Sequence, residues 1–164
     1  MKKHILLLFC FVLTLVTVNE SRAQAVLEIG GDVGERLSLT MDELKALHVQ
    51  KYLAQSMKGD TATYDVVRLI DVLALAGVPS GSQVKGEHVQ KVVVVTAADG
   101  YKAVFSLAEL DPKSTDNAAL LAIGVYGKSL DKRVGPLRLI VPNDQLHSRW
   151  VREVRSIFVV YPQL

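Results

Sequence analysis

Three arginines and a histidine lie close together near the C-terminal end of the chain: Arg138, His147, Arg149 and Arg152. A guanidinium group can donate two parallel hydrogen bonds to a phosphate or to another oxyanion. The sequence therefore predicts an anion-binding site at these four residues. The alternative is a solvated turn, followed by an antiparallel strand from which Arg152 and Arg155 alternate outward.

Two other kinds of site are weighed and set aside. Asp144, His147 and Ser148 have the residue types of a hydrolytic triad, but they are crowded into one turn and no Gly-x-Ser-x-Gly elbow is present. His48, His88 and His147 show no metal-ligand spacing on a shared element. No catalytic residue and no metal ligand is therefore assigned.

Residues 122–129 satisfy a relaxed phosphate-loop pattern that ends in Gly127, Lys128 and Ser129. Such a loop works only when a helix begins behind it, because the N–H groups of the helix N-terminus face the phosphates. Gly135 and Pro136 follow too soon for that helix. We therefore expect a turn between two strands here.

Residues 1–25 have the composition of a secretory signal peptide. Lys2 and Lys3 precede an apolar stretch over residues 5–18, and small residues at Ala23 and Ala25 provide a cleavage site. The apolar stretch is short for a membrane span, which needs about 20 residues. We expect an exported protein, periplasmic or secreted, with no membrane span after cleavage. An uncleaved N-terminal anchor is the alternative.

Cleavage changes both the charge and the cysteine content. It removes Lys2, Lys3, Arg22 and Glu20 from 19 basic and 17 acidic residues, so the remainder is formally neutral. A neutral domain gives no electrostatic reason to expect nucleic acid as a partner. The chain's one cysteine, Cys10, also leaves. The remainder then has no disulfide, no thiolate nucleophile and no cysteine ligand for a metal.

Strand patterns outnumber helix patterns over residues 26–164, which we expect to form a single domain. Strands are predicted at 26–29, 36–39, 64–67, 89–96, 101–105, 118–126, 137–141 and 154–160, with an irregular one at 48–57. Short helices are predicted after a capping box at Thr40 and Glu43, over 68–76, and after Ser106. The order favours an α+β fold with mixed, mainly antiparallel sheets.

Several motifs occur in an order that is typical of a known family. They are the helix ending in Ala76-Gly77-Val78, the strand–Ala98-Asp99-Gly100-Tyr101–strand unit with its following Ser106-Leu107-Ala108-Glu109-Leu110, residues 120–130, and the final run from Gly135-Pro136-Leu137-Arg138 to Ile157. Together they resemble the oxidoreductase molybdopterin-binding domain, with its sulfite-oxidase-type fold, in the form of its small stand-alone exported members.

The resemblance implies a cofactor and site residues. In the family, an arginine that follows a motif containing Gly and Pro contacts the pterin region, and it corresponds to Arg138 of Gly135-Pro136-Leu137-Arg138. The later basic residues correspond to Arg149 and Arg152. Family enzymes hold molybdenum through a cysteine thiolate, which has no counterpart after residue 25. Molybdopterin is the cofactor implied by resemblance, and none is assigned from the residues alone.

Three functions stay open at this point. The first is an exported domain that binds a pterin-type or other anionic ligand, or a protein partner, without independent molybdenum catalysis. The second is a molybdopterin-dependent oxidoreductase subunit that works with a redox partner protein. The third is a structural or interaction module that keeps only the fold.

Overall fold

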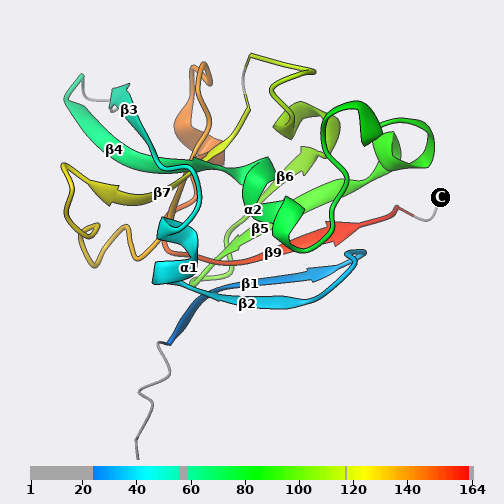
Figure 1. Ribbon diagram of the computed structural model, residues 1–164. Helices are drawn as coiled ribbons and strands as arrows, with labels where there is room; N and C mark the ends of the chain where they lie inside the picture. Colours follow the sequence, from blue (N-terminus) through cyan, green and yellow to red (C-terminus); the bar gives the residue numbers. More distant parts are fainter. Residues whose placement is uncertain (1–23, 56–58, 117, 163–164) are drawn as a thin grey trace, which may run out of the picture.

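The computed structural model describes residues 24–55, 59–116 and 118–162 (Figure 1). The strands are Ala25–Gly31 (β1), Leu37–Thr40 (β2), Gln50–Gln55 (β3), Thr61–Arg68 (β4), Val92–Ala97 (β5), Lys102–Ser106 (β6), Leu120–Val125 (β7), Arg138–Ile140 (β8) and Val154–Val160 (β9). The α-helices are Met41–Lys45 (α1) and Leu69–Leu75 (α2), and the 3₁₀ turns are Gly81–Gln83 (η1), Gly86–Gln90 (η2), Ala108–Leu110 (η3) and His147–Arg149 (η4).

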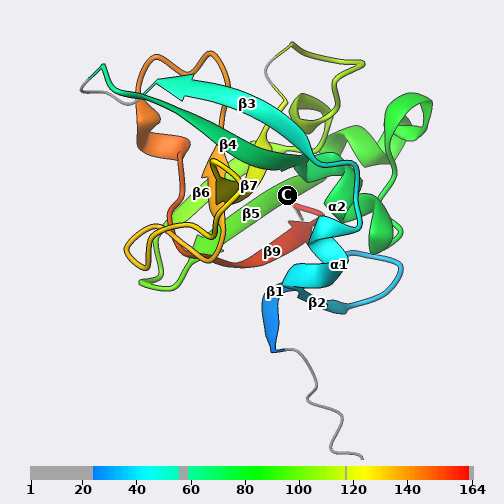
Figure 2. The same cartoon turned by 60° about the vertical axis from the view of Figure 1, so that its left-hand side comes forward.

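The strands form a five-stranded sheet in the order β2-β1-β9-β5-β6 and a four-stranded sheet in the order β3-β4-β7-β8. All pairs are antiparallel except β1 with β9. The four-stranded sheet lies above the five-stranded one, and the two α-helices lie together to one side of them (Figures 1 and 2). The predicted α+β class with mainly antiparallel sheets is confirmed.

The first helix begins as the sequence predicts. The Thr40 hydroxyl accepts a hydrogen bond from the Glu43 backbone N–H at 3.3 Å, and the Glu43 carboxylate accepts one from the Thr40 N–H at 2.7 Å. The capping box therefore satisfies donors that a helix N-terminus leaves free. The Thr40 backbone N–H, and then the Thr40 hydroxyl, lower the pKa of Glu43.

Helix α2 buries the predicted apolar stripe. Leu69, Val72, Leu73 and Ala76 are all fully buried, which follows from their spacing on one helix face. Gly77 ends the helix with φ +76°, a left-handed conformation that glycine adopts without steric cost.

Some local predictions were wrong in detail. Only Gly100 has a positive φ in the β5–β6 turn, although both turn residues were expected to supply one. The strand predicted from Val89 begins at Val92, because Gly86–Gln90 forms η2. The loop before it holds a second 3₁₀ turn, η1, and η4 was not expected at all.

Two hydrophobic clusters fill the interior. The larger lies between the sheets and α2 and includes Leu73, Val95 and Ile157, whereas the smaller includes Val66 and Ile140 on the four-stranded sheet. Trp150 packs against both clusters, so the loop before β9 is anchored to the whole core.

Residues 1–23 lie outside the described part of the chain, and so does most of the predicted signal peptide. β1 begins at Ala25, which pairs with Thr40. Cleavage after Ala23 would therefore leave this strand whole. None of the helices in the described ranges is long and apolar enough to cross a membrane.

Candidate functional site

A cavity of about 570 Å³ opens where the β5–β6 turn meets β8 and the segment between η4 and β9. Its charged and aromatic wall residues are Asp99, Tyr101, Arg138, His147, Trp150, Arg152 and Glu153. Three of the four predicted binding residues therefore line one cavity. The fourth, Arg149, does not.

Arg138 begins β8 and is held by aromatic side chains. Its Nη1 donates a hydrogen bond to the Tyr64 hydroxyl at 2.9 Å. Its guanidinium carbon lies 5.7 Å from the ring centroid of Tyr64 and 5.4 Å from that of Trp150, within the range of cation–π attraction. The sheet fixes this arrangement, because β7 pairs with both β4, which carries Tyr64, and β8.

One donor of Arg138 is unsatisfied. Its Nε is buried and has no hydrogen-bond partner. Among the described residues, Nδ1 of His88 is in the same situation. Buried donors are nearly always paired, since leaving one unpaired costs about 1–3 kcal/mol. Because this Nε is closed to solvent, an acceptor oxygen in the cavity reaches it only after a small movement of the Arg138 side chain, and such a bond would remove this cost.

His147 and Trp150 form a stacked pair in the cavity wall. Their ring centroids are 3.7 Å apart and the planes differ by 11°. The Trp150 Nε1–H donates to the Val141 carbonyl at 3.0 Å, which fixes the indole. The sequence favours Trp150 as a core residue; the structure gives it that role and a stacking role as well.

Arg149 is committed to two carboxylates. Its Nε and Nη2 donate to Asp144 at 2.9 and 2.7 Å, and its Nη1 donates to Glu109 at 3.0 Å. The guanidinium also lies 4.9 Å from the ring centroid of Phe105. The hydrogen bonds that Arg149 donates to Asp144 are the main reason why the pKa of Arg149 is raised. Arg149 therefore ties η4 to η3 and β6 outside the main cavity.

The cavity carries both signs of charge. Arg138 and the exposed Arg152 supply two cations, whereas Asp99 and Glu153 supply two carboxylates. The Asp99 carboxylate accepts a hydrogen bond from the Tyr101 N–H at 2.9 Å, so it stabilises the β5–β6 turn. An anion in this cavity must lie on the side of Arg138, away from the acidic residues.

Glu153 adopts an unusual backbone conformation at the cavity wall, with φ +48°. Two backbone hydrogen bonds hold it there: its N–H donates to the Val134 carbonyl, and its carbonyl accepts from the Ala98 N–H, both at 2.9 Å. A non-glycine residue in this region costs about 1–3 kcal/mol. The adjoining shift in register between β5 and β9 shows that the strand is bent here.

The sequence analysis missed four residues of the site: Tyr64, Asp99, Tyr101 and Glu153. Tyr64 lies 74 positions from Arg138, so no local spacing links the two. The Tyr101 hydroxyl donates to the Ser148 carbonyl at 2.6 Å and joins the β5–β6 turn to η4. Tyr64 and Arg138 also line a second cavity of about 200 Å³, which shares the wall formed by Arg138 and Trp150.

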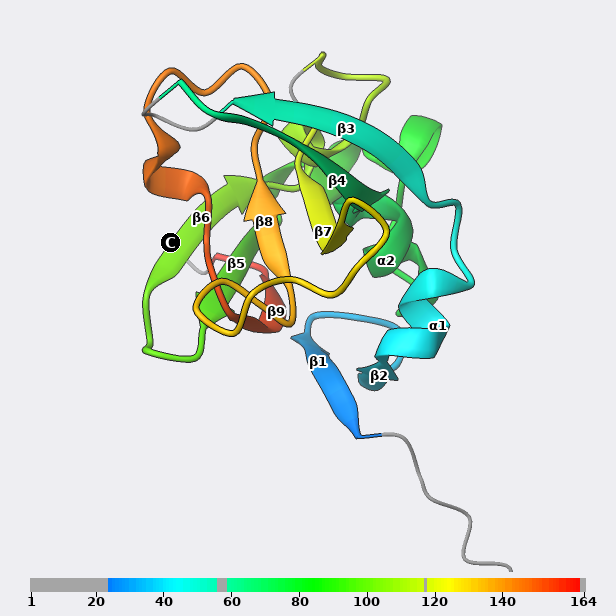
Figure 3. The same cartoon turned by 90° about the vertical axis from the view of Figure 1, so that its left-hand side faces the viewer.

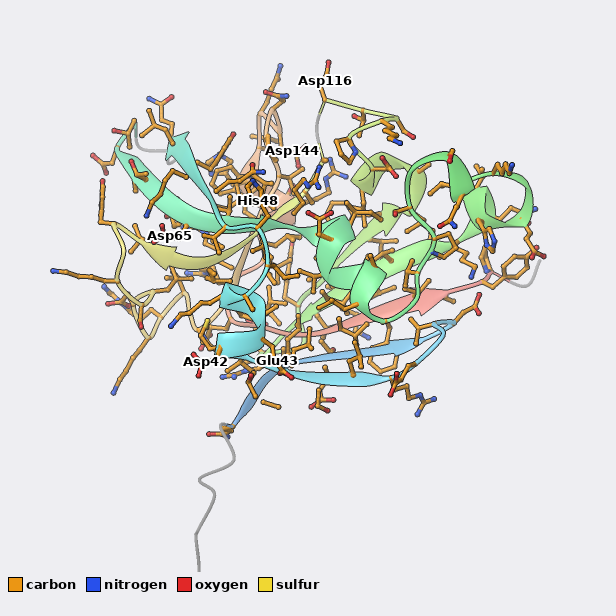
Figure 4. All side chains as sticks on the ribbon, in the orientation of Figure 1. Asp42, Glu43, His48, Asp65, Asp116 and Asp144 are labelled. Atoms are coloured by element: carbon orange, nitrogen blue, oxygen red, sulfur yellow. The ribbon has the colours of Figure 1, made fainter. Side chains whose placement is uncertain are left out.

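The candidates set aside in the sequence analysis come from separate segments or are paired otherwise. The three histidines come from the connection between α1 and β3 (His48, labelled in Figure 4), from η2 (His88) and from η4 (His147). Asp144 binds Arg149, and Gly127 lies in a turn with no helix behind it. In the described part of the chain, no group of three or more His, Cys, Asp or Glu side chains could hold a metal ion.

Comparison with known proteins adds the family. The model of the oxidoreductase molybdopterin binding domain matches residues 15–162. The chain belongs to this family. A solved structure with a similar fold is the sulfane dehydrogenase SoxCD from Paracoccus pantotrophus, at a TM-score of 0.63 and 22% identity. The match covers 83% of this chain and 38% of that one, so the chain spans well under half of its length. A search of curated proteins gives no match.

The family implies a molybdopterin cofactor, and the residues fit it only in part. The unsatisfied Nε of Arg138 beside two aromatic rings suits an anionic, planar group such as a pterin with its phosphate. The described residues supply no thiolate for the metal, because Cys10 lies outside them. The residues therefore fit the pterin part of the cofactor, whereas the described residues give the molybdenum no cysteine ligand.

The structure separates a structural arginine from an exposed one. Arg149→Ala should lower the free energy of unfolding by about 1–2 kcal/mol, because it leaves Asp144 and Glu109 without their cation. Arg152→Ala should change it by no more than about 0.5 kcal/mol, because the side chain is exposed. Urea denaturation of both variants measures this. Equal effects would contradict the structural role of Arg149.

Proposed function

We propose that this chain is an exported member of the molybdopterin-binding domain family that binds an anionic ligand, of pterin type or an oxyanion, without independent molybdenum catalysis. The observation that carries the proposal is the buried Nε of Arg138, which lacks an acceptor beside a cavity of about 570 Å³. The ligand would supply that acceptor. Trp150 and His147 would offer flat surfaces to a planar ring.

The missing cysteine is the reason for the non-catalytic part of the proposal. If residues 1–25 are removed, no thiolate remains in the chain. Thiolate is a softer ligand than an imidazole nitrogen or a carboxylate oxygen, so these groups are not equivalent ligands for a metal. The second candidate is a molybdopterin-dependent oxidoreductase subunit, with a ligand or redox function from a partner chain; family membership favours it.

Binding should depend on the shape of the Arg138 side chain as well as on its charge. Arg138→Lys keeps the charge but loses the planar set of donors, so it should weaken binding nearly as much as Arg138→Ala, by about tenfold or more. Calorimetric titration with inorganic phosphate and with a phosphorylated pterin measures the affinity.

The matched control is Arg133→Ala, because Arg133 is exposed and pairs with Asp131 outside the cavity. This variant should bind like the unaltered protein. Binding that tolerates Arg138→Lys and falls steeply with salt would indicate a diffuse surface charge instead. No binding of either probe to the unaltered protein would remove the proposed site.

Export predicts a defined N-terminus. Protein recovered from its producing cell should begin just after Ala23 or Ala25, because the small residues there suit the peptidase that removes signal sequences. Intact-mass spectrometry with N-terminal peptide mapping shows the cleavage point. A chain that retains residues 1–22 in the soluble fraction would contradict export.

A further inference from the structure

The outer face of the five-stranded sheet carries a continuous apolar patch. Phe158, Val160 and Val104 are 44%, 41% and 54% exposed, and they alternate along their strands with buried residues such as Ile157, Val159 and Phe105. The half-buried Val92 and Val94 of β5 lie between them. We call these five residues the outer face.

The inner side of the same sheet is covered. In Figure 3 the strands from β6 to β2 curve along the left and lower margin, and the four-stranded sheet and both α-helices lie inside this curve. No such layer lies over the outer face in the part of the chain that the structure describes. Apolar patches of this kind, rimmed by charge, mark interaction sites in soluble proteins.

The strand pairing arranges the outer face in rows across the sheet. One row runs through Gly30, Phe158, Val94 and Val104 on β1, β9, β5 and β6. A Cβ atom placed on Gly30 would lie 3.2 Å from the Phe158 ring, so the ring lies over β1. This row is therefore closely packed and apolar from β1 to β6.

The next row carries opposite charges at its two ends. It runs through Glu28, Ser156, Thr96 and Lys102 on the same four strands. Glu28 and Lys102 are both exposed. Between them lie only the two hydroxyl side chains, so the row is acidic at β1 and basic at β6.

We propose that a second copy of this chain covers the outer face, related by a twofold axis that runs parallel to the strands between β9 and β5. This axis exchanges β1 with β6 and β9 with β5 while keeping each row on itself. Glu28 of one copy then faces Lys102 of the other, and the two apolar rows meet. Two sheets packed in this aligned way lie about 10 Å apart.

The charge pattern selects this axis over the other twofold arrangement. An axis perpendicular to the strands would place Glu28 over β1 of the second copy, and β1 carries no cation. The sheet curves away from its outer face (Figure 3), so the flanks of the two copies diverge in either arrangement, and the Glu28–Lys102 pair spans the gap through the length of its side chains.

The size of the patch sets the strength of the association. Four strands span about 19 Å across the sheet, and three rows of side chains span about 20 Å along it, so the patch covers on the order of 400 Å². This area is less than the roughly 800 Å² per partner of a standard stable interface. We therefore expect a weak dimer, with a dissociation constant on the order of 100 µM.

Sedimentation velocity over a concentration series, on protein purified from its producing cell, tests the proposal. The unaltered chain should shift from monomer to dimer with concentration. Glu28→Lys and Lys102→Glu should each raise the dissociation constant by on the order of tenfold, because each replaces two attractions by two repulsions. The double variant Glu28→Lys/Lys102→Glu should restore the original value.

Two matched controls reverse an exposed charge that lies outside these rows. They are Asp116→Lys, at the top of the molecule in Figure 4, and Lys132→Glu, on the loop between β7 and β8. Both should dimerise as the unaltered chain does, and circular dichroism should show every variant folded. A chain that stays monomeric to about 1 mM would overturn the proposal. So would a dimer in which the double variant fails to restore association.

Discussion

The pairing of β9 with both β1 and β5 is the constraint on which the rest of the structure depends. This last strand lies at the centre of the five-stranded sheet, parallel to β1 and antiparallel to β5. The chain enters β9 at Glu153, where two backbone hydrogen bonds hold φ at +48°. The bend sends the preceding segment, with Trp150 and His147, across the end of β8. The same strand presents Phe158 outward. The path of β9 therefore positions both a wall of the cavity and the outer face.

The arginines around this bend show how identical side chains take different roles. Arg149 donates its hydrogen bonds to Asp144 and Glu109 and so stabilises the loop. Arg138 has one donor paired with Tyr64 and another left without an acceptor. Arg152 is exposed at the cavity rim. The donor without a partner is the reason why the proposed ligand binding rests on Arg138, whereas proximity in sequence alone gives all three equal weight.

Much of the fold was predictable because local signals and packing agree. The capping box at Thr40, the apolar stripe of α2 and the glycine after it each follow from short-range rules, and the structure confirms them. The site was predictable only in part. Arg138, His147 and Arg152 line one cavity as expected, but Tyr64 lies 74 residues from Arg138 and Glu109 lies 40 residues from Arg149. These two remote partners are set by the tertiary fold, which no spacing in the sequence encodes, whereas Asp144 is only five residues from Arg149.

Family membership and the residues of this chain lead to different expectations about bound molybdenum. The matched family binds molybdopterin, while the one cysteine of the chain is Cys10, within the segment expected to be removed. The most direct measurement is the molybdenum and pterin content of protein purified from its producing cell, by elemental mass spectrometry and by the fluorescence of the oxidised pterin. We predict far less than one molybdenum atom per chain, with any bound pterin lost in Arg138→Ala. One molybdenum atom per chain would contradict the account.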